Sequence, residues 1–216
     1  MYILKTILIS FFFIGIFYCQ SDSNFEFKYS ILTKSAQNLD DLVAVDDSSI
    51  IYSGDQIRIN IGYLPETYFY VIYVDTESNY SIIYSKKSEL TKIANSLYFD
   101  TVLPWTKFVD PPGFETFYLI NSRNKLEDLE LSFSQYAKAS GKMKLKLSKR
   151  IQSNIDNLNP THQSMSHFAS RLEDPLVGGV TFRGEDENKI SDMSVTHSCK
   201  GNDGFAIKRV ILDHLK

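Results

Sequence analysis

Residues 67–75 read TYFYVIYVD, and every side chain between Thr67 and Asp75 is apolar or aromatic. Because successive side chains of a strand point to opposite faces, such a run predicts a strand that is covered on both sides. Residues 115–121 (ETFYLIN) repeat the pattern. Residues 56–63 (QIRINIGY) instead alternate isoleucine with polar residues, which predicts a strand with one face on the core. These segments indicate a mainly β chain.

Further strands extend this pattern in both directions along the chain. Residues 25–31 alternate in the same way, and residues 80–84 follow as a hairpin partner. We expect two short strands at 97–103 and 105–109, separated by Pro104, because proline cannot donate a ladder hydrogen bond. About six or seven short strands with regular turns are typical of an antiparallel sandwich or barrel. We therefore predict β-sandwich-like antiparallel sheets.

A helical period replaces the strand period in the next part of the chain, which we assign as helical over residues 130–175. Apolar residues recur at helical spacing over 126–136 and again over 147–158, which predicts one or two amphipathic helices packed against the sheets. The start of the second helix is basic. Its cations can form either a solvated helix face or a patch that meets anionic lipid headgroups, and they are Lys142, Lys144, Lys146, Lys149 and Arg150.

The C-terminal part, residues 176–216, returns to strand patterns. We expect a strand at 176–182 and a hairpin around Gly201–Gly204 that returns along 205–215. Earlier in the chain, the acidic stretch 40–47 reads as a solvated linker. It lacks the spacing of carboxylates around a glycine turn that calcium binding requires.

Composition and charge limit the classes of function. The chain has 216 residues, a formal charge of −3 and two cysteines. A mildly acidic chain without a strong basic field is a poor candidate for binding nucleic acid, so we expect no nucleic-acid partner. The length is enough for one large domain, and we assign residues 25–216 to a single β-rich domain.

The first residues predict export. Lys5 precedes an uncharged apolar run over residues 6–18, which is shorter than the about 20 residues that span a bilayer but has the length of a signal core. Cys19 ends this run, so residues 1–19 read as a lipoprotein signal with Cys19 as the lipidation site and 20–24 as a short tether. Plain secretion and an uncleaved anchor are the alternatives. We expect an outer-membrane lipoprotein that is held to the membrane by its N-terminal lipid. It can lie on either the periplasmic or the outer surface of that membrane.

Residues 53–129 carry several short motifs in a fixed order. They are a Gly-Asp turn (54–55), the aromatic strand ending at Asp75, Leu103-Pro104, and the turn Pro-Pro-Gly-Phe-Glu at 111–115. In this order they resemble the bacterial family known as domain of unknown function 4384. The resemblance implies a β-rich module of exported or envelope proteins. It implies no activity, so it transfers no catalytic residue.

The chemistry-bearing residues form no catalytic pattern that we recognise. His197 and Cys199 share a strand face and are the one candidate pair for a thiol nucleophile, but no third orienting group is apparent. His162 and His167 are five residues apart, which places them on different faces of a helix. His197 and Cys199 could reach one ion together, but His214 would lie about 20 Å farther along the returning strand. A tetrahedral site needs three or four nearby ligands, so we expect no metal site and no cofactor.

Tyrosines in the strands offer a second kind of site. Tyr68, Tyr70, Tyr80 and Tyr84 can line one sheet face and contact a protein or a glycan, or they can simply pack against other elements. We therefore expect a non-catalytic envelope module that binds or scaffolds protein or glycan. An enzyme with a site near His197 and Cys199, and a purely structural envelope protein, are the alternatives.

Overall fold

The structure is a computed structural model that describes residues 25–39, 42–88, 98–158, 167–168, 197–201 and 204–216. The predicted signal at 1–19, the tether at 20–24 and the predicted strand at 176–182 lie outside these residues. His162, one of the histidines considered as a metal ligand, lies outside them too.

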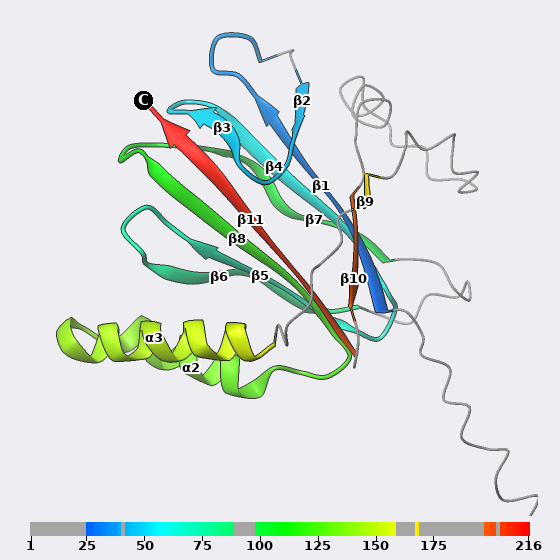
Figure 1. The fold of residues 1–216 in the computed structure, drawn as a ribbon, viewed down its shortest axis with the longest axis vertical. Coiled ribbons are helices and arrows are strands. Elements are labelled where there is room, and N and C mark those ends of the chain that lie inside the picture. The colour runs from blue at the N-terminus through cyan, green and yellow to red at the C-terminus, as the bar shows by residue number, and fades with distance from the viewer. Residues whose placement is uncertain (1–24, 40–41, 89–97, 159–166, 169–196, 202–203) are drawn as a thin grey trace, which may run out of the picture.

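The described strands form two sheets, so the fold is β-sandwich-like with two helices (Figure 1). Sheet A contains β7 (Tyr98–Lys107), β4 (Gln56–Tyr63), β1 (Phe25–Lys34), β10 (His197–Gly201) and β9 (His167–Phe168) in this order, and β2 (Leu42–Val45) also pairs with β1. Sheet B contains β3 (Ser49–Tyr52), β11 (Phe205–Leu215), β8 (Gly113–Ser122), β5 (Tyr68–Val74) and β6 (Tyr80–Lys87). All pairs are antiparallel except β3 with β11, which is parallel.

The predicted strands 56–63 and 67–75 are confirmed as β4 and β5. In β4 the isoleucines are buried and the intervening polar residues are only half-buried. In β5, Phe69 and Val71 face the core between the sheets, while Tyr70 and Ile72 face the second core beneath the helices. A strand that is apolar on both faces thus lies between two cores.

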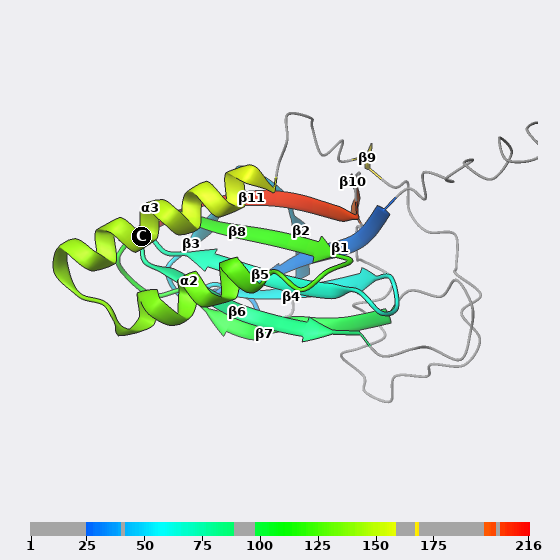
Figure 2. The same ribbon diagram turned by 90° about the horizontal axis from the view of Figure 1, so that it is seen from below.

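Both predicted helices are present, but the helical assignment of 130–175 is wrong at His167–Phe168, which form strand β9, and residues 159–166 and 169–175 lie outside the described residues. Helix α2 (Glu127–Lys138) buries Leu129 and Phe133, and α3 (Gly141–Asn157) buries Leu147 and Ile151. The two helices lie next to each other on one side of the sandwich and cover part of the outer face of sheet B (Figure 1, Figure 2). No helix among the described residues is long and apolar enough to cross a membrane.

The prediction of two strands around Pro104 is wrong, because β7 is one continuous strand from Tyr98 to Lys107. Strand β7 has β4 as its neighbour in the described part of sheet A and is otherwise at the edge, where a proline is tolerated. The pairing of β4 with β7 shifts register around Ile57 and Ile59, so a bulge absorbs the irregularity.

The predicted hairpin of residues 197–201 and 205–215 is also wrong. Strand β10 pairs with β1 in sheet A, whereas β11 pairs with β8 and β3 in sheet B. The chain therefore crosses from one sheet to the other after Gly201. A Cβ on Gly201 would meet the backbone of Phe205 and lie 2.6 Å from Cα of Ala206, so the crossing is too tight for any larger residue.

The acidic turn between β2 and β3 is not the solvated linker that we expected. Asp47 accepts a hydrogen bond from the backbone N–H of Ile211 at 2.8 Å. Asp46 lies 3.8 Å from Nδ1 of His197 on sheet A and 4.0 Å from Nζ of Lys208 on sheet B. The turn thus connects the two sheets.

Candidate functional site

The helices leave one end of the outer face of sheet B uncovered. Tyr118 and Ile207 lie beneath the helices, but farther along the same two strands Phe114 is 67% exposed. Asp213 of β11 pairs with Phe114 on one side and with Ile50 on the other, so the three side chains share the outer face. We call this surface the outer patch and define it by its five apolar members, Ile50, Tyr52, Phe114, Ile211 and Leu215.

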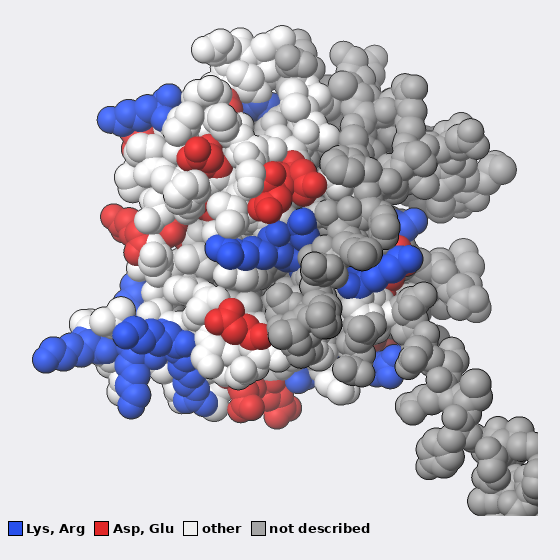
Figure 3. Space-filling view, viewed as in Figure 1, with Lys and Arg blue, Asp and Glu red and all other residues white. Residues whose placement is uncertain are grey.

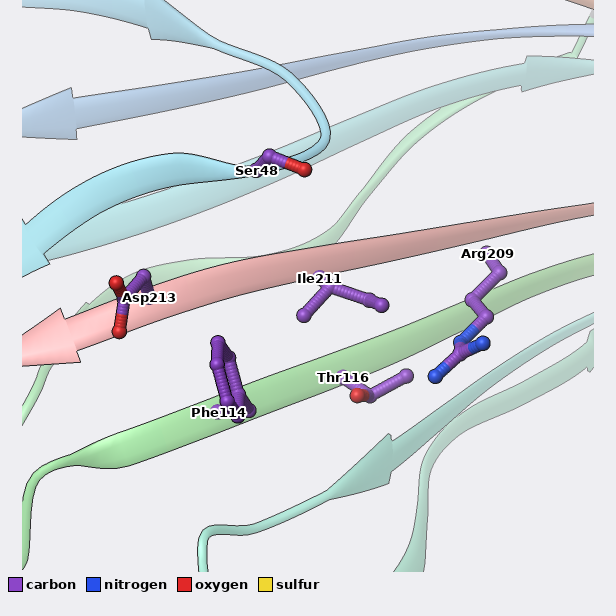
Figure 4. Close-up of a pocket in the computed structure, with 6 residues that line it drawn as sticks. All are labelled: Ser48, Phe114, Thr116, Arg209, Ile211 and Asp213. Carbon is purple, nitrogen blue, oxygen red and sulfur yellow. The ribbon is translucent and has the colours of Figure 1, made fainter.

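A shallow pocket of about 340 Å³ lies within this surface (Figure 4). Phe114 and Ile211 provide apolar walls, and Arg209 and Asp213 stand at its two ends. Thr116 and Ser48 complete the lining. The pocket therefore combines an exposed aromatic ring with two hydroxyl groups and two opposite charges.

The two charges are separated along a single strand. Arg209 and Asp213 are four residues apart on the outer face of β11, which corresponds to about 13 Å at 3.3 Å per residue. The guanidinium of Arg209 lies 6.0 Å over the ring of Tyr118. No ion pair between described residues engages either charge, so both are available to a bound partner.

Three of the four tyrosines of the predicted ligand face lie on the side of sheet B that the helices cover. Tyr70 is fully buried, and its hydroxyl donates to Glu130 at 2.9 Å. Tyr80 is half-buried, and its hydroxyl donates to Gln152 of α3 at 3.0 Å. Tyr68 packs against the same core. These rings hold the helices to the sheet.

Tyr84 lies on the opposite face of the sheet. Its ring packs against the core between the sheets, and its hydroxyl donates to Asp100 at 2.8 Å. The pairing of β5 with β6 shifts register between Val71 and Ile72, which reverses the alternation in β6. The period of two that places Tyr80 and Tyr84 on one face is therefore interrupted by a bulge.

His197 and Cys199 both point into the core between the sheets, at 2% and 1% exposure. Burial raises the pKa of the Cys199 thiol to about 12, although Lys208 opposes the shift. Burial also lowers the pKa of His197. The thiol donates to the carbonyl of Ile207 at 3.4 Å. A buried, protonated thiol lacks the access and the thiolate character that a nucleophile requires.

A chain of hydrogen bonds that was not predicted from the sequence surrounds His214. Its Nε2 lies 3.0 Å from Oγ of Ser53, and its Nδ1 lies 3.3 Å from Oε1 of Glu115. Tyr73 donates to the other oxygen of Glu115 at 2.5 Å. His214 and Glu115 are almost completely buried, and burial raises the pKa of Glu115. The order serine, histidine, carboxylate is that of a hydrolase triad.

The surroundings of Ser53 do not supply the other parts of such a site. The N–H groups of Ser53, Gly54 and Asp55 donate to backbone carbonyls, so this turn offers no donor to an oxyanion. The Ser53 hydroxyl donates to Asp110 at 2.8 Å. The chain of hydrogen bonds connects the turn after β3 with β5, β8 and β11 and acts as a structural network of sheet B. Among the described residues, no group of three His, Cys, Asp or Glu can hold a metal ion.

No family model matches the chain. No curated protein matches it, and no solved structure does. The resemblance of residues 53–129 to domain of unknown function 4384 therefore stays a prediction.

The residues of the outer patch were not predicted as a site either. The alternation in 205–215 places Arg209, Ile211 and Asp213 on one face, and Phe114 follows the turn at 111–113. These signals show which side chains share a face. They do not show that the helices stop short of that face.

Proposed function

We propose that this protein is an exported, lipid-anchored and non-catalytic module of the bacterial envelope that binds a partner protein through the outer patch. The observation that supports this proposal best is the outer patch itself, where exposed apolar side chains lie beside two opposite charges that form no ion pair with the described residues. Exposed apolar side chains that lie side by side within a polar rim are typical of surfaces that bind a partner.

A protein partner fits the composition better than a glycan. Three of the five members of the outer patch are aliphatic, and the other two are the aromatic residues Phe114 and Tyr52. Protein interfaces combine such an apolar centre with aromatic and arginine side chains and a polar rim. Arg209 and Asp213 provide a charge at each end, which would set the orientation of an extended segment of the partner.

The absence of catalysis in this proposal rests on two observations. The thiol of Cys199 is buried, and its pKa is raised to about 12. Ser53 donates to Asp110, and the N–H groups of its turn are already bonded. Neither candidate nucleophile combines an activated group with a stabilised oxyanion.

The location in the envelope is inferred from the first residues. The apolar run at 6–18 and Cys19 fit a lipoprotein signal, and the described fold begins at Phe25. Six residues span at most about 20 Å, so a lipid on Cys19 would hold the domain close to the bilayer. Incorporation of labelled palmitate that is lost in Cys19→Ser tests this part of the proposal, and unchanged incorporation would contradict it.

The binding role can be tested by photo-crosslinking in the cells that produce the protein. A photoreactive phenylalanine analogue is placed at Phe114 or Leu215, and at the exposed control positions Leu131 and Thr106. We expect one defined protein adduct from the first two positions only. The adduct should disappear in Arg209→Glu.

The control for this charge reversal is Lys200→Glu, since Lys200 is exposed on β10 in the other sheet. Adducts that are the same at all four positions would contradict a specific patch. Adducts to the protein itself would instead support the purely structural alternative. Crosslinking to glycan with no protein adduct would overturn the choice of a protein partner.

A further inference from the structure

Helix α3 begins with a dense group of cations. Residues 139–155 contain five lysines and arginines and no acidic residue. In Figure 3, blue side chains gather over the helical end of the molecule at the lower left. Figure 1 shows the same end of the helix pair extending beyond the strands. The chain as a whole has a formal charge of −3, so this positive region contrasts with the rest of the protein.

Four of the five cations share the exposed face of the helix. At 100° per residue, they lie on the side opposite to the buried Leu147, Ile151 and Ile155. They are Lys142, Lys146, Lys149 and Arg150, all exposed, and we call them the basic face. Met143 and Leu145 flank this face and are themselves 58% and 61% exposed.

Lys144 has a different role. Its ammonium donates to Asn79 at 2.8 Å and lies 5.1 Å from the ring of Tyr136. These contacts hold the start of α3 to the β5–β6 turn and to α2. Lys144 therefore fixes the position of the helix, and the other four cations are left to solvent.

The basic face is unfavourable for the helix that carries it. The N-terminal end of a helix has a partial positive charge, which favours acidic residues in the first turn. Helix α2 follows this rule with Glu127, Asp128 and Glu130, whereas α3 has no acidic residue there. Lys142 and Lys146 are also four residues apart, a spacing at which like charges repel. An anionic surface would remove both penalties.

We propose that the basic face of α3 docks on an anionic phospholipid bilayer. The four cations would contact the headgroups, and Met143 and Leu145 would enter the boundary between headgroups and acyl chains. The complementarity of charge and the two protruding apolar side chains carry this choice. Apolar side chains at both margins of a basic face serve no purpose on a nucleic-acid backbone.

The same bilayer can also hold the N-terminal lipid. In Figure 1, strand β1 begins at the lower right of the molecule, and the helices lie along the lower left, with the basic start of α3 at the opposite end from the start of β1. A lipid on Cys19 and the basic face of α3 would therefore be two separate contacts with one flat bilayer, at opposite ends of the molecule. The contact through a lipid on Cys19 rests on the proposed function, whereas binding of α3 to the bilayer does not.

The test is binding of the full chain to vesicles, measured by flotation at about 0.1 M salt. Vesicles contain phosphatidylcholine alone or with one quarter phosphatidylglycerol. In the basic-face variant, Lys142, Lys146 and Lys149 are each replaced by Gln, which keeps a good helix former. The matched control makes the same replacement at three exposed lysines elsewhere, Lys107, Lys200 and Lys216. The apolar run at 6–18 is common to all these proteins and cancels in the comparison.

Each cation near an anionic surface changes the partition coefficient by about fivefold, so the basic-face variant should bind about a hundredfold more weakly. The control variant should stay within about threefold of the unaltered chain. Met143→Ser with Leu145→Ser should weaken binding too, whereas Val109→Ser should not. Binding of the unaltered chain should also fall steeply as salt is raised.

Equal binding of the basic-face and control variants would overturn the proposal. So would displacement of the protein from anionic vesicles by an equal charge concentration of RNA. Thermal unfolding of each variant shows that the fold is kept. Phe114→Ser should leave vesicle binding unchanged, so that failure of the protein-binding proposal and failure of the lipid proposal are told apart.

Discussion

The hydroxyl of Tyr70 provides the sharpest test of how the helices are held to the sheet. Tyr70 is fully buried, its hydroxyl accepts from the backbone N–H of Leu126 at 3.1 Å, and it donates to Glu130 at 2.9 Å. Helix α2 begins at Glu127 and has no side-chain cap at Leu126. The tyrosine hydroxyl of the sheet therefore takes the place of a helix cap. Tyr70→Phe removes this oxygen and leaves the ring.

The expected loss follows from the two hydrogen bonds. A typical hydrogen bond contributes about 1 kcal/mol, one to a charged group about 1.5–3 kcal/mol, and a buried partner left without a bond adds to the loss. The ring keeps its packing, so no large cavity forms. We expect Tyr70→Phe to lower the free energy of unfolding by about 2–3 kcal/mol. For a domain of this size, the melting temperature should fall by about 4–12 °C.

Urea-induced unfolding followed by far-UV circular dichroism measures this loss. The control is Tyr118→Phe, since Tyr118 is buried in the same core and its hydroxyl makes no hydrogen bond among the described residues. The control should lose less than about 0.5 kcal/mol. Equal losses in the two variants would refute the capping role of Tyr70. If the Tyr70→Phe protein had normal stability but failed to bind its partner, Tyr70 would be a ligand-contacting residue, as the sequence predicted.

Three other predictions concern the interior. Gly201→Ala should destabilise the protein by about 3 kcal/mol or more in the same urea assay, because the new Cβ meets the backbone of Phe205. A loss below about 1 kcal/mol would contradict the tight crossing between the sheets. In a Cys19→Ser background, Cys199 should react with maleimide at pH 7.5 only after unfolding, since the thiol is buried and its pKa is raised to about 12. Rapid labelling of the folded protein would disprove this prediction. Burial raises the pKa of Glu115 above its unfolded value, so its contribution to stability is greatest below about pH 4.5 and is lost as the pH rises through the folded pKa. Glu115→Gln should therefore gain stability relative to the unaltered protein between pH 4 and 7, and parallel pH profiles would be inconsistent with this shift.

The elements that were predicted correctly are those whose pattern is complete within a few residues. The alternation in 56–63 and the continuous apolar run in 67–75 each identify a strand and the number of its covered faces. The helical spacing of Leu147, Ile151 and Ile155 identifies both the helix and its buried side. In these segments, local periodicity and tertiary burial agree, so the sequence alone is sufficient.

The errors arose where the choice of a partner strand decides the structure. The turn signal at Gly201–Gly204 favours a hairpin, but β10 pairs with β1, which lies more than 160 residues earlier in the chain. That pairing depends on the distant strand β1 and not on the local turn signal. The bulge in β6 is a similar case, because it depends on the register between β5 and β6 and reverses the face of Tyr84. Contacts between distant segments override local signals at both places.

The outer patch could not be predicted for a related reason, since its exposure depends on how far the helical layer reaches. Two helices side by side, each about 10 Å wide, cover a band of roughly 20 Å, whereas the 11 residues of β11 extend over about 36 Å. The helices run obliquely across the strands (Figure 1), and their band reaches Ile207 but leaves Phe114 at 67% exposure. The alternation of apolar and polar side chains in β11 continues past the edge of this band, where no helix covers the outer face. The same pattern that builds the helical core thus leaves apolar side chains at the far end of the strand, where a second protein can cover them.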